Sequence, residues 1–410
     1  MSSKGKITTA ARGRPALVPK RRFPEFRDAG EWQEKSLSSC LTPVARERIK
    51  PSEGYKGLGL RSHGKGTFLK EDPAKNAMDV LYEVKREDLI VNITFAWEGA
   101  IAIAGSSDDG ALVSHRFPTY TFSKDRALPE FFKFKVVDKQ FVYKLGLISP
   151  GGAGRNRVMS KTDFLKLKVL LPSPDEQQKI ADCLDTADAL IAAQGRKVEA
   201  LRAHKKGLMQ QLFPQDGETQ PRLRFPEFEG AGEWSEAKLV AACNFQAGKF
   251  VAASEIQEHS AEGLFPCYGG NGLRGYTASF THSGRYPLIG RQGALCGNVK
   301  YAVGKFHATE HAVVASPKKR VCVDWLFYLL DHLDLNKFAT GQAQPGLSVD
   351  VLNNVMTSIP QDEAEQQRIA DCLTSLDDLI AAETRKLDTL KAHKKGLMQQ
   401  LFPQVGEGDA

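Results

Sequence analysis

The fold of this chain is decided by a forty-residue stretch that occurs twice. Residues 176–215 read EQQKIADCLDTADALIAAQGRKVEALRAHKKGLMQQLFPQ, and residues 365–404 read EQQRIADCLTSLDDLIAAETRKLDTLKAHKKGLMQQLFPQ. The two copies are 189 residues apart and are identical at 29 of 40 positions. In both copies apolar residues recur every 3.5 residues on average, which is the period of a coiled-coil seam. The sequence therefore predicts two similar helices of about 37 residues, each about 55 Å long.

Stepping by four and three residues along each copy gives ten seam positions, eight of which are apolar. A long amphipathic helix cannot bury its apolar stripe alone, so we expect the two helices to pair with each other. The alternative is that each helix packs only on its own neighbouring domain. Two polar seam positions, Gln194/Glu383 and Lys205/Lys394, are placed to set the register of the pair. The apolar residues assigned to the seam are Ile180, Leu184, Ile191, Val198, Leu201, Leu208, Ile369, Leu373, Leu376, Ile380, Leu387, Leu390 and Leu397.

Local signals mark where both helices begin and end. The run Ser173–Glu176 has the pattern of a capping box with proline at the first helical position. Asp362 with Glu365 is the aspartate version of the same pattern. Pro214 and Pro403 cannot continue a helix, so each helix is predicted to end just before its proline.

A shorter repeat opens each half of the chain. Residues 22–37 read RFPEFRDAGEWQEKSL and residues 224–239 read RFPEFEGAGEWSEAKL. The bodies that follow, residues 38–171 and 240–359, do not resemble each other. We interpret the chain as a tandem duplication in which a frame was kept and two bodies diverged, with simple drift as the alternative. The predicted segments are a basic disordered tail (1–20), a first domain (21–172), a central helix (173–214), a linker (215–222), a second domain (223–360), a C-terminal helix (361–404) and a tail (405–410).

Both bodies have the texture of strands and turns with short helices, which indicates an α+β fold. In the first body, residues 88–97, 99–105 and 119–122 read as strands and residues 128–137 as a short helix. In the second body, residues 264–316 alternate short apolar runs with turn signals, and residues 324–338 read as a helix.

The amino-acid composition limits the classes of protein to which the chain can belong. The 410 residues are 41% hydrophobic and 26% charged, which is typical of a globular protein, and no apolar run reaches the length of a membrane span. The basic N-terminus lacks the apolar core of a secretory signal. Seven scattered cysteines without a CxxC pair favour reduced thiols over disulfides or a zinc ribbon. The net charge of +7 is compatible with nucleic-acid binding.

Catalytic motifs are weak or absent. Gly59–Lys65 has the letters of a phosphate loop but no following apolar helix, and Gly270–Gly275 has the letters of a dinucleotide fingerprint without one. Asp79, Glu83 and Lys85 have the letters of a metal-dependent nuclease site, which would make the chain a standalone enzyme. There is no Asn-Pro-Pro-aromatic run for base methylation and no helicase motif. The sequence therefore favours a chain that recognises its target over one that transforms it, and a scaffold without base specificity is the other alternative.

The long repeats and the frames around them resemble the specificity (S) subunit of type I restriction–modification enzymes. The signature is EQQKIAD-x-L…D-x-x-I…K-x-x-x-L-x-x-x-KKGLMQQLF, and the resemblance covers nearly the whole chain after residue 20. It implies an α+β fold with two target-recognition domains, separated by an antiparallel coiled coil in a pseudo-two-fold arrangement. It implies that each domain reads one half of an interrupted site on double-stranded DNA, while the helices set the spacing.

The resemblance also implies a role for partner subunits. Two methyltransferase (M) subunits and two motor-nuclease (R) subunits would carry out adenine methylation or cleavage in the bacterial or archaeal cytoplasm. Catalysis, S-adenosylmethionine, ATP and magnesium would belong to those partners, so no catalytic activity, cofactor or metal is expected in this chain.

Base readout requires polar side chains on loops that reach the edges of the bases. In the first body the candidates are Arg61, Ser62, His63, Lys65, Ser114, His115, Arg116, Arg155, Asn156 and Arg157. In the second body they are Asn271, Arg274, Arg291, Gln292, His307, Gln342 and Gln344.

Overall fold

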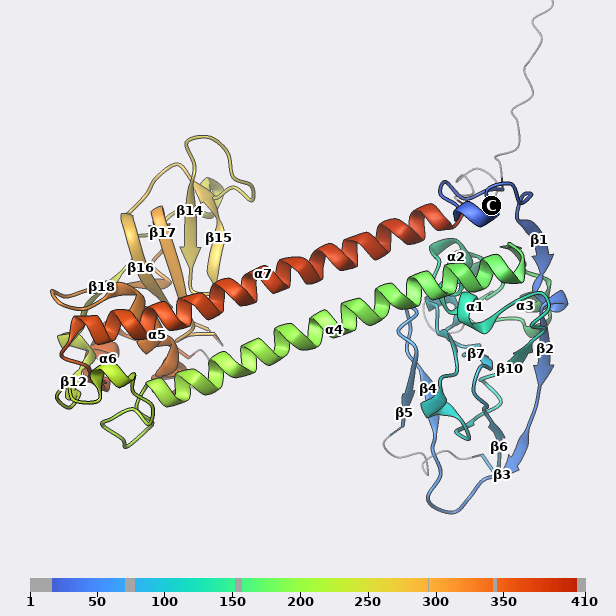
Figure 1. Cartoon of the computed structure of the whole chain (residues 1–410), viewed down its shortest axis with the longest axis horizontal. Helices are drawn as coiled ribbons and strands as arrows, with labels where there is room; N and C mark the ends of the chain where they lie inside the picture. The colour runs from blue at the N-terminus through green and yellow to red at the C-terminus, as the bar shows by residue number, and fades with distance from the viewer. Residues whose placement is uncertain (1–16, 71–77, 152–156, 294, 342–344, 404–410) are drawn as a thin grey trace, which may run out of the picture. The chain divides into compact units, whose positions relative to one another are not determined.

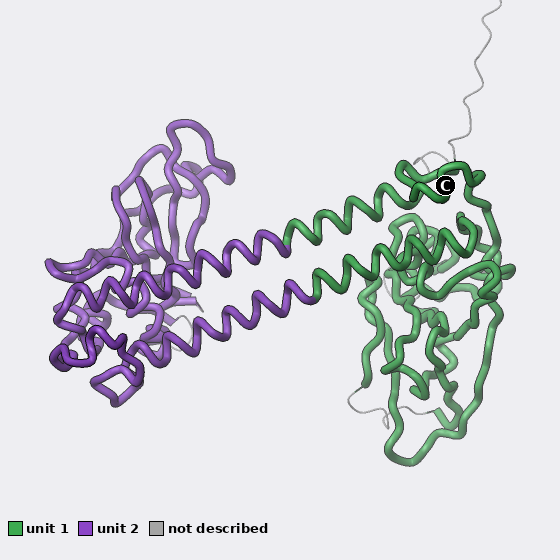
Figure 2. The backbone as a smooth tube through the Cα atoms, in the orientation of Figure 1, with its two compact units in different colours: residues 1–192, 388–410 green, residues 193–387 purple. Residues whose placement is uncertain are grey.

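The structure is a computed structural model that describes residues 17–70, 78–151, 157–293, 295–341 and 345–403. The chain divides into two compact units (Figure 2). The first unit comprises residues 1–192 and 388–410, and the second comprises residues 193–387. Each unit therefore contains one body together with part of each long helix. Among the described residues, no helix has both the length and the apolar character needed to cross a membrane.

The two predicted long helices are present and pack together (Figure 1). They are α4 (Pro174–Leu212) and α7 (Glu363–Leu401), and each has 39 residues. In the first unit Asp188 of α4 bonds Lys394 of α7, and in the second unit Lys205 of α4 bonds Asp377 of α7. Rising numbers in α4 meet falling numbers in α7, so the pair is antiparallel. The predicted fold class is confirmed, and the alternative in which each helix packs only on its own body is wrong.

Burial along both helices follows the predicted step. Ile180, Leu184 and Val198 of α4 and Ile369 and Leu373 of α7 are at most 2% exposed. The remaining seam positions are half-buried, and no predicted seam residue is exposed. The apolar stripe is thus covered along its length, which supplies the burial that a helix of this length requires.

The helix caps differ in one respect from the predicted capping boxes. The Ser173 hydroxyl accepts a hydrogen bond from the Glu176 amide at 3.3 Å, and Asp362 accepts one from the Ala364 amide at 2.9 Å. The carboxylates of Glu176 and Glu365 do not close the boxes, because each binds an arginine of the frame instead. The acidic residues at these helix starts are therefore tertiary anchors.

The first body is built from small antiparallel sheets and short helices. A four-stranded sheet has the order β2-β10-β7-β8, a three-stranded sheet has the order β3-β6-β9, and β4 pairs with β5. The strands are β2 (Leu41–Val44), β3 (Glu47–Ile49), β4 (Leu58–Leu60), β5 (Thr67–Leu69), β6 (Val80–Glu83), β7 (Leu89–Val91), β8 (Ile101–Ile103), β9 (Leu112–Val113) and β10 (Thr119–Phe122). The helices are α1 (Pro129–Lys135), α2 (Lys139–Leu147) and α3 (Lys161–Lys166).

The second body is built on one six-stranded sheet of order β13-β18-β16-β17-β14-β15. All neighbours in it are antiparallel except β14 and β17, which run parallel. The strands are β13 (Cys243–Ala247), β14 (Phe265–Gly269), β15 (Gly272–Thr277), β16 (His282–Gly290), β17 (Val299–Ala308) and β18 (Ala312–Pro317). The helices are α5 (Val323–His332) and α6 (Val349–Asn354).

Two expectations about local structure need correction. Residues 88–97 do not form one strand, because β7 ends at Val91 and the chain turns into a 3-10 helix, η4 (Ala96–Glu98). The helix expected over residues 324–338 ends at His332 and continues as the 3-10 turn Leu335–Phe338. In the first case the Asn92 side chain accepts a hydrogen bond from the Thr94 amide at 3.1 Å, and this local turn replaces strand pairing.

Each body is closed by a pair of frame strands. In the first unit β1 (Gln33–Ser36) pairs antiparallel with β11 (Lys168–Leu171). In the second unit β12 (Ser235–Lys238) pairs in the same way with β19 (Met356–Ile359). The point where the chain enters a body therefore lies beside the point where it leaves.

Candidate nucleic-acid interface

The arginine of each RFPEF repeat is bound by the first glutamate of each long repeat. Arg22 donates to both carboxylate oxygens of Glu176 at 2.8 and 2.6 Å. Arg224 does the same with Glu365, at 2.7 Å for each bond. Both glutamate side chains are 1% exposed. These bidentate pairs fix the start of each helix against the RFPEF segment of the same unit.

The glutamine after each of these glutamates holds the body. Gln177 donates to the carbonyls of Arg126 and Pro172 at 2.8 and 3.0 Å and accepts from the Leu128 amide at 2.9 Å. Gln366 accepts from the Cys322 amide at 2.8 Å and donates to the Pro360 carbonyl at 3.0 Å. The same side-chain type thus secures two unrelated bodies, because it binds backbone groups that any sequence supplies.

The end of each helix carries an aromatic anchor. Phe213, after α4, packs against Trp234 and Trp325 with ring centroids 6.4 and 6.2 Å apart. Phe402, after α7, packs 6.0 Å from Trp32. Each phenylalanine of the LFP repeat therefore packs on the tryptophan of a frame repeat, and both are at most 5% exposed.

In the first body the loop between β4 and β5 lies along η4. The His63 amide donates to the Glu98 carbonyl at 2.7 Å, and the Ser62 hydroxyl donates to the Glu98 carboxylate at 2.7 Å. His63 has a positive φ of 62°, which places it at the tip of the turn. Arg61 and Lys65 on the same loop are exposed.

The other candidates of the first body approach the same turn from two sides. The Arg157 guanidinium lies 5.3 Å from the centroid of the Trp97 ring in η4. The Arg116 carbonyl accepts from the Ile93 amide at 3.0 Å, so Ser114, His115 and Arg116 lie beside the chain that leads into η4. The structure thus gathers three sequence-distant groups into one surface, here called the η4 patch: residues 61–65, 93–98, 114–116 and Arg157.

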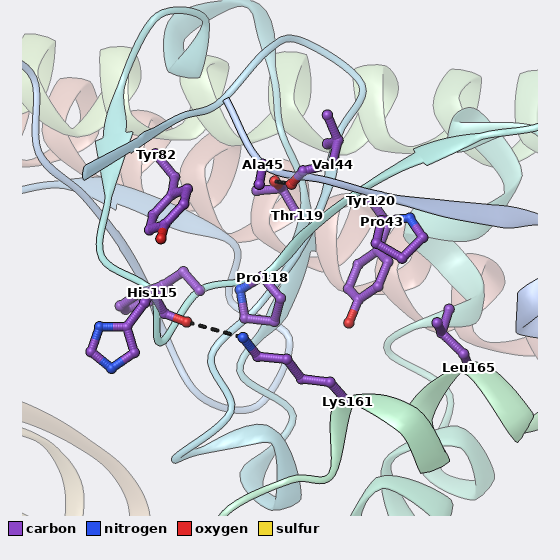
Figure 3. Close-up of a pocket in the computed structure, with 11 residues that line it drawn as sticks. Pro43, Val44, Ala45, Tyr82, His115, Pro118, Thr119, Tyr120, Lys161 and Leu165 are labelled. Carbon is purple, nitrogen blue, oxygen red and sulfur yellow. Dashed lines mark hydrogen bonds between the residues drawn. The ribbon is translucent and has the colours of Figure 1, made fainter. Parts of the chain in front are cut away.

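A hollow of about 290 Å³ lies at the side of the η4 patch formed by residues 114–116 (Figure 3). Lys161 lines the hollow, and its ammonium donates a hydrogen bond to the His115 carbonyl at 3.5 Å. Apart from His115 and Thr119, whose hydroxyl donates to the Val44 carbonyl, the rest of the lining is aromatic or apolar: Pro43, Val44, Ala45, Tyr82, Phe117, Pro118, Tyr120 and Leu165. Its one lysine is held by a backbone carbonyl, so the hollow itself presents little charge.

In the second body the candidates converge on the loops at one end of the sheet. The Arg291 amide donates to the His311 carbonyl at 2.9 Å, and the Arg291 carbonyl accepts from Leu347 at 2.9 Å. A hollow of about 460 Å³ opens between these loops. A Cβ on Gly290 would stand 2.1 Å from the Gly270 carbonyl, so this convergence requires glycine. The polar residues that line the hollow, here called the loop patch, are Asn271, Arg274, Gln292 and His311.

His307 does not belong to the loop patch. It is 5% exposed, and its ring nitrogens lie 3.0 Å from the Ser279 hydroxyl and 3.0 Å from the Lys249 carbonyl. Both ring nitrogens of His307 already have partners inside the body. We therefore interpret His307 as a residue that stabilises the body, where the sequence had suggested a contact with a base. Four other candidates, Arg155, Asn156, Gln342 and Gln344, lie outside the described residues.

Sequence reasoning missed three residues of these surfaces, Phe95, Trp97 and His311, and one residue beside the loop patch, Lys300. Phe95 is 42% exposed and Trp97 stacks under Arg157, both within the turn that was read as a strand. His311 lines the loop patch, and Lys300 lies against the hairpin at Gly272. The available signal was the Asn92–Thr94 turn pattern, which places the aromatic residues that follow it outside the sheet.

The weak enzyme motifs are accounted for by structure. Gly59–Lys65 is part of the β4–β5 hairpin, and Gly272 to Gly275 lie in β15, so no helix follows either motif. Hydrogen bonds from Lys85 and Arg48 lower the pKa of Glu83, and both of its oxygens are engaged by these cations. Within the described ranges, no group of three or more His, Cys, Asp or Glu residues could hold a metal ion.

Comparison with known proteins identifies the family to which the chain belongs. The family model described as the type I restriction modification DNA specificity domain matches residues 68–202 and again residues 232–392. The chain belongs to this family. The two matches of the specificity domain correspond to the two halves of the internal duplication, and the resemblance seen in the repeats is confirmed.

Named relatives of the specificity-domain family agree with this result. The specificity subunit of the type I restriction enzyme EcoprrI from Escherichia coli is 37% identical over 229 residues, covering 54% of this chain and 55% of the relative. The MjaVIII specificity subunit from Methanocaldococcus jannaschii is 27% identical over 270 residues, covering 60% of this chain and 63% of the relative. The aligned part of the chain thus spans less than two thirds of either relative.

Solved structures share the fold of this specificity-domain chain. The crystal structure of the S subunit of a type I restriction–modification system from M. genitalium has a TM-score of 0.62 and 16% identity, covering 95% of this chain and 100% of that chain. A chain from a structural study of the assembly and conformational transition of the type I system has a TM-score of 0.55 and 17% identity, covering 92% and 98%. At these identities the likeness concerns the fold.

Proposed function

We propose that this chain is the DNA sequence-recognition subunit of a type I restriction–modification complex. Each body reads one half of a bipartite, interrupted site on double-stranded DNA. The observation that carries the proposal is the contrast between a repeated frame and two unlike bodies. The frame contacts recur in both units, whereas one body holds several small sheets and the other a single six-stranded sheet. Two different readers in equivalent frames suit a site with two different halves.

The surfaces of the bodies support contact with DNA. The η4 patch combines Arg61, Lys65, Arg116 and Arg157 with the aromatic residue Trp97. The loop patch presents Arg274, Asn271 and Gln292, the side-chain types that pair with guanine and adenine edges. Arginine and lysine supply contacts to phosphates, and arginine also pairs with guanine edges, so both patches carry groups suited to DNA. The loop patch adds the amides of Asn271 and Gln292, which suit adenine edges. We assign the recognition domains to residues 21–172 and 223–360.

The helices support recruitment of two copies of one partner. Many residues that are identical in the two long repeats are exposed, so packing between α4 and α7 does not explain their identity. We propose that they form two equivalent docking surfaces for two methyltransferase subunits. The exposed identical positions on which the proposal rests are Gln178/Gln367, Asp182/Asp371, His204/His393 and Lys206/Lys395.

Chemistry belongs to the partners in this proposal. The methyltransferase subunits use S-adenosylmethionine for adenine methylation, and the motor-nuclease subunits use ATP and magnesium for cleavage. This chain acts in the cytoplasm as the non-catalytic subunit. The engaged carboxylate of Glu83 supports the assignment, because Lys85 and Arg48 occupy the oxygens that a metal would need.

A body exchange tests the proposal. Residues 240–355 are replaced by the body of another such subunit, so that the frame strands β12 and β19 are kept and still pair. The methylated motif is then read by single-molecule sequencing of DNA from cells that express the chain with its methyltransferase partner. We expect one half-site to change and the other to stay. Exchange of residues 38–167, which keeps β1 and β11, is the matched control and changes the opposite half. A change in both halves, or in neither, contradicts the modular assignment.

A matched insertion tests whether the helices set the spacing. Seven residues, one heptad, are added to α4 between Lys197 and Lys205 and to α7 between Asp377 and Glu383. The apolar seam then keeps its register, and so do the contacts Gln194–Glu383 and Lys205–Asp377 on either side of the insertion. Seven residues add about 10 Å, or roughly three base pairs of B-DNA. We expect the methylated motif to keep both half-sites with a longer spacer. Insertion in α4 alone breaks the register and serves as the control. An unchanged spacer with full activity means that the helices do not set the distance.

A further inference from the structure

The two long repeats allow every contact between α4 and α7 to be compared with its symmetry equivalent. Residue i of α4 corresponds to residue i + 189 of α7. Under this relation the bond between Lys205 and Asp377 becomes a bond between Lys394 and Asp188. Both bonds exist: the Lys205 ammonium lies 2.7 Å from the Asp377 carboxylate, and the Lys394 ammonium lies 2.6 Å from the Asp188 carboxylate. The helix pair therefore has a local two-fold relation.

These two ion pairs set orientation and register but do not distinguish the helices. Each helix carries both partners, Asp188 and Lys205 in α4 and Asp377 and Lys394 in α7. Two copies of α4, or two copies of α7, could form the same ion pairs with each other. The seam is equally permissive, since an apolar residue in one repeat corresponds to an apolar residue in the other. A chain with two such helices could thus pair wrongly with like helices of a second copy.

One contact differs from the rest. Gln194 bonds Glu383, and these residues are each other's equivalents because their numbers differ by 189. A contact between equivalent residues lies on the two-fold axis itself. The Gln194 amide donates to the Glu383 carboxylate at 2.6 Å and to the Glu383 carbonyl at 2.9 Å. Gln194 is 7% exposed and the Glu383 side chain is 14% exposed, so water screens the contact poorly.

Like helices would place identical residues at this axis. Two copies of α7 would bring two Glu383 carboxylates together with no amide donor between them. Two copies of α4 would bring two Gln194 amides together, which can bond each other but leave Lys197 without the carboxylate that it now contacts. We propose that the unlike pair Gln194–Glu383, on the local two-fold axis, makes α4 pair with α7 in preference to a like helix from a second copy of this chain.

Charged groups around the axis define the expected pH behaviour. The groups that act on Glu383 are Lys197 of α4, which bonds it, and Lys386 of α7. Hydrogen bonds from Lys197 and Gln194 lower the pKa of Glu383 from its usual value of 4.5. A lowered folded pKa means that the carboxylate stabilises the pair above about pH 4.5 and loses that effect as the pH falls further. Two facing glutamates behave oppositely, because like charges raise a pKa and protonation then relieves the repulsion.

Single substitutions in the full chain can reproduce the pair of residues that each wrong pairing would place at the axis. Gln194→Glu places two glutamates at the axis, as in pairing of two α7 helices. Glu383→Gln places two glutamines there, as in pairing of two α4 helices. The double variant Gln194→Glu/Glu383→Gln exchanges the residues, and symmetry then places Lys386 where it can bond the new glutamate. Thermal unfolding of all four proteins is followed by circular dichroism at pH 7.5 and at pH 4.5.

At pH 7.5 we expect Gln194→Glu to have the lowest melting temperature, a few degrees below the unmodified chain. Glu383→Gln shows a smaller loss, and the double variant recovers most of the loss of Gln194→Glu. At pH 4.5 the deficit of Gln194→Glu shrinks. Equal stability of Gln194→Glu and the unmodified chain would overturn the proposal, as would a double variant no more stable than Gln194→Glu. If Gln194→Glu does not fold at neutral pH, comparison of Glu383→Gln with the double variant still decides it, because only the latter keeps an unlike pair.

Discussion

The two copies of the frame differ far less than the two bodies that they hold. Arg22–Glu176 and Arg224–Glu365 are the same buried pair, and Phe402 and Phe213 pack on tryptophans in the same way. A difference lies at the ring nitrogens of the two tryptophans. Trp234 donates from its ring nitrogen to Glu365 at 3.1 Å, whereas the ring nitrogen of Trp32 has no partner among the residues that the structure describes.

The bodies show the opposite behaviour. They share neither sheet order nor strand number, and only elements at their boundaries correspond: the closing strands, the 3-10 turns Leu37–Ser39 and Leu239–Ala241, and the helices α3 and α6. The comparison teaches where sequence is free to change. A frame residue contacts another frame residue, so a change at one site leaves its partner unmatched. A body needs only to begin and end at two adjacent strands, and its interior can be replaced as a unit.

The buried arginine–glutamate pairs should give the largest effects on stability. Glu365→Gln leaves Arg224 without its charge partner and weakens the acceptor of Trp234. We expect a loss of about 3–5 kcal/mol in the free energy of unfolding, because a buried charge remains uncompensated. Glu176→Gln should cost somewhat less, since Trp32 donates no bond to it. Urea unfolding followed by circular dichroism measures both.

The outer frame pair Arg368–Glu227 provides the control for that comparison. Both of its side chains are about half exposed, at 48% and 49%, so Glu227→Gln should leave the free energy of unfolding nearly unchanged. If the three glutamate variants lose equal stability, the buried pairs do not anchor the helices.

The patches should give intermediate effects that are confined to one half of the site. Arg274→Ala in the loop patch and Arg157→Ala in the η4 patch should each weaken DNA binding by about 1–3 kcal/mol. The measurement is the affinity of the assembled methyltransferase for DNA in which either half-site is scrambled. Each variant should lose discrimination at its own half only. Arg222→Ala, which breaks the exposed pair with Glu218, is the control and should leave binding unchanged. Loss of discrimination at both halves would argue against separate readers.

The tryptophans should give the smallest difference and sharpen the comparison of the frames. Trp234→Phe removes a hydrogen bond to a charged group, which contributes about 1.5–3 kcal/mol. Trp32→Phe removes no bond and takes an unpaired donor out of the core, so it should cost about 1–2 kcal/mol less. Unfolding midpoints in urea test this order. A greater loss for Trp32→Phe would show that packing against Phe402 outweighs the bond to Glu365.

Sequence patterns predicted some features well and others poorly. The helices were predictable because their seam repeats over ten positions, and each position adds to the same signal. The stretch 88–97 was misread because a three-residue strand is too short to show a period, and the Asn92 turn follows it directly. The loop patch was predictable in part, since Asn271, Arg274 and Gln292 lie in glycine-rich turns. The burial of His307 was not predictable, because it depends on contacts with Ser279 and Lys249, which are 28 and 58 residues away.

The sequence by itself determined the duplication, the two long helices, the α+β class and membership of the specificity-domain family. These features follow from local periodicity and from identity between the repeats, which can be read without knowing any contact. Only the tertiary structure decided that Glu176 and Glu365 bind frame arginines instead of closing capping boxes. It also decided that three distant loops meet at η4, and that Gln194 meets its own equivalent on the local two-fold axis. The reason is physical. Each of these contacts depends on which groups become neighbours once the apolar seam is buried. The apolar pattern that buries the seam does not specify which polar groups meet.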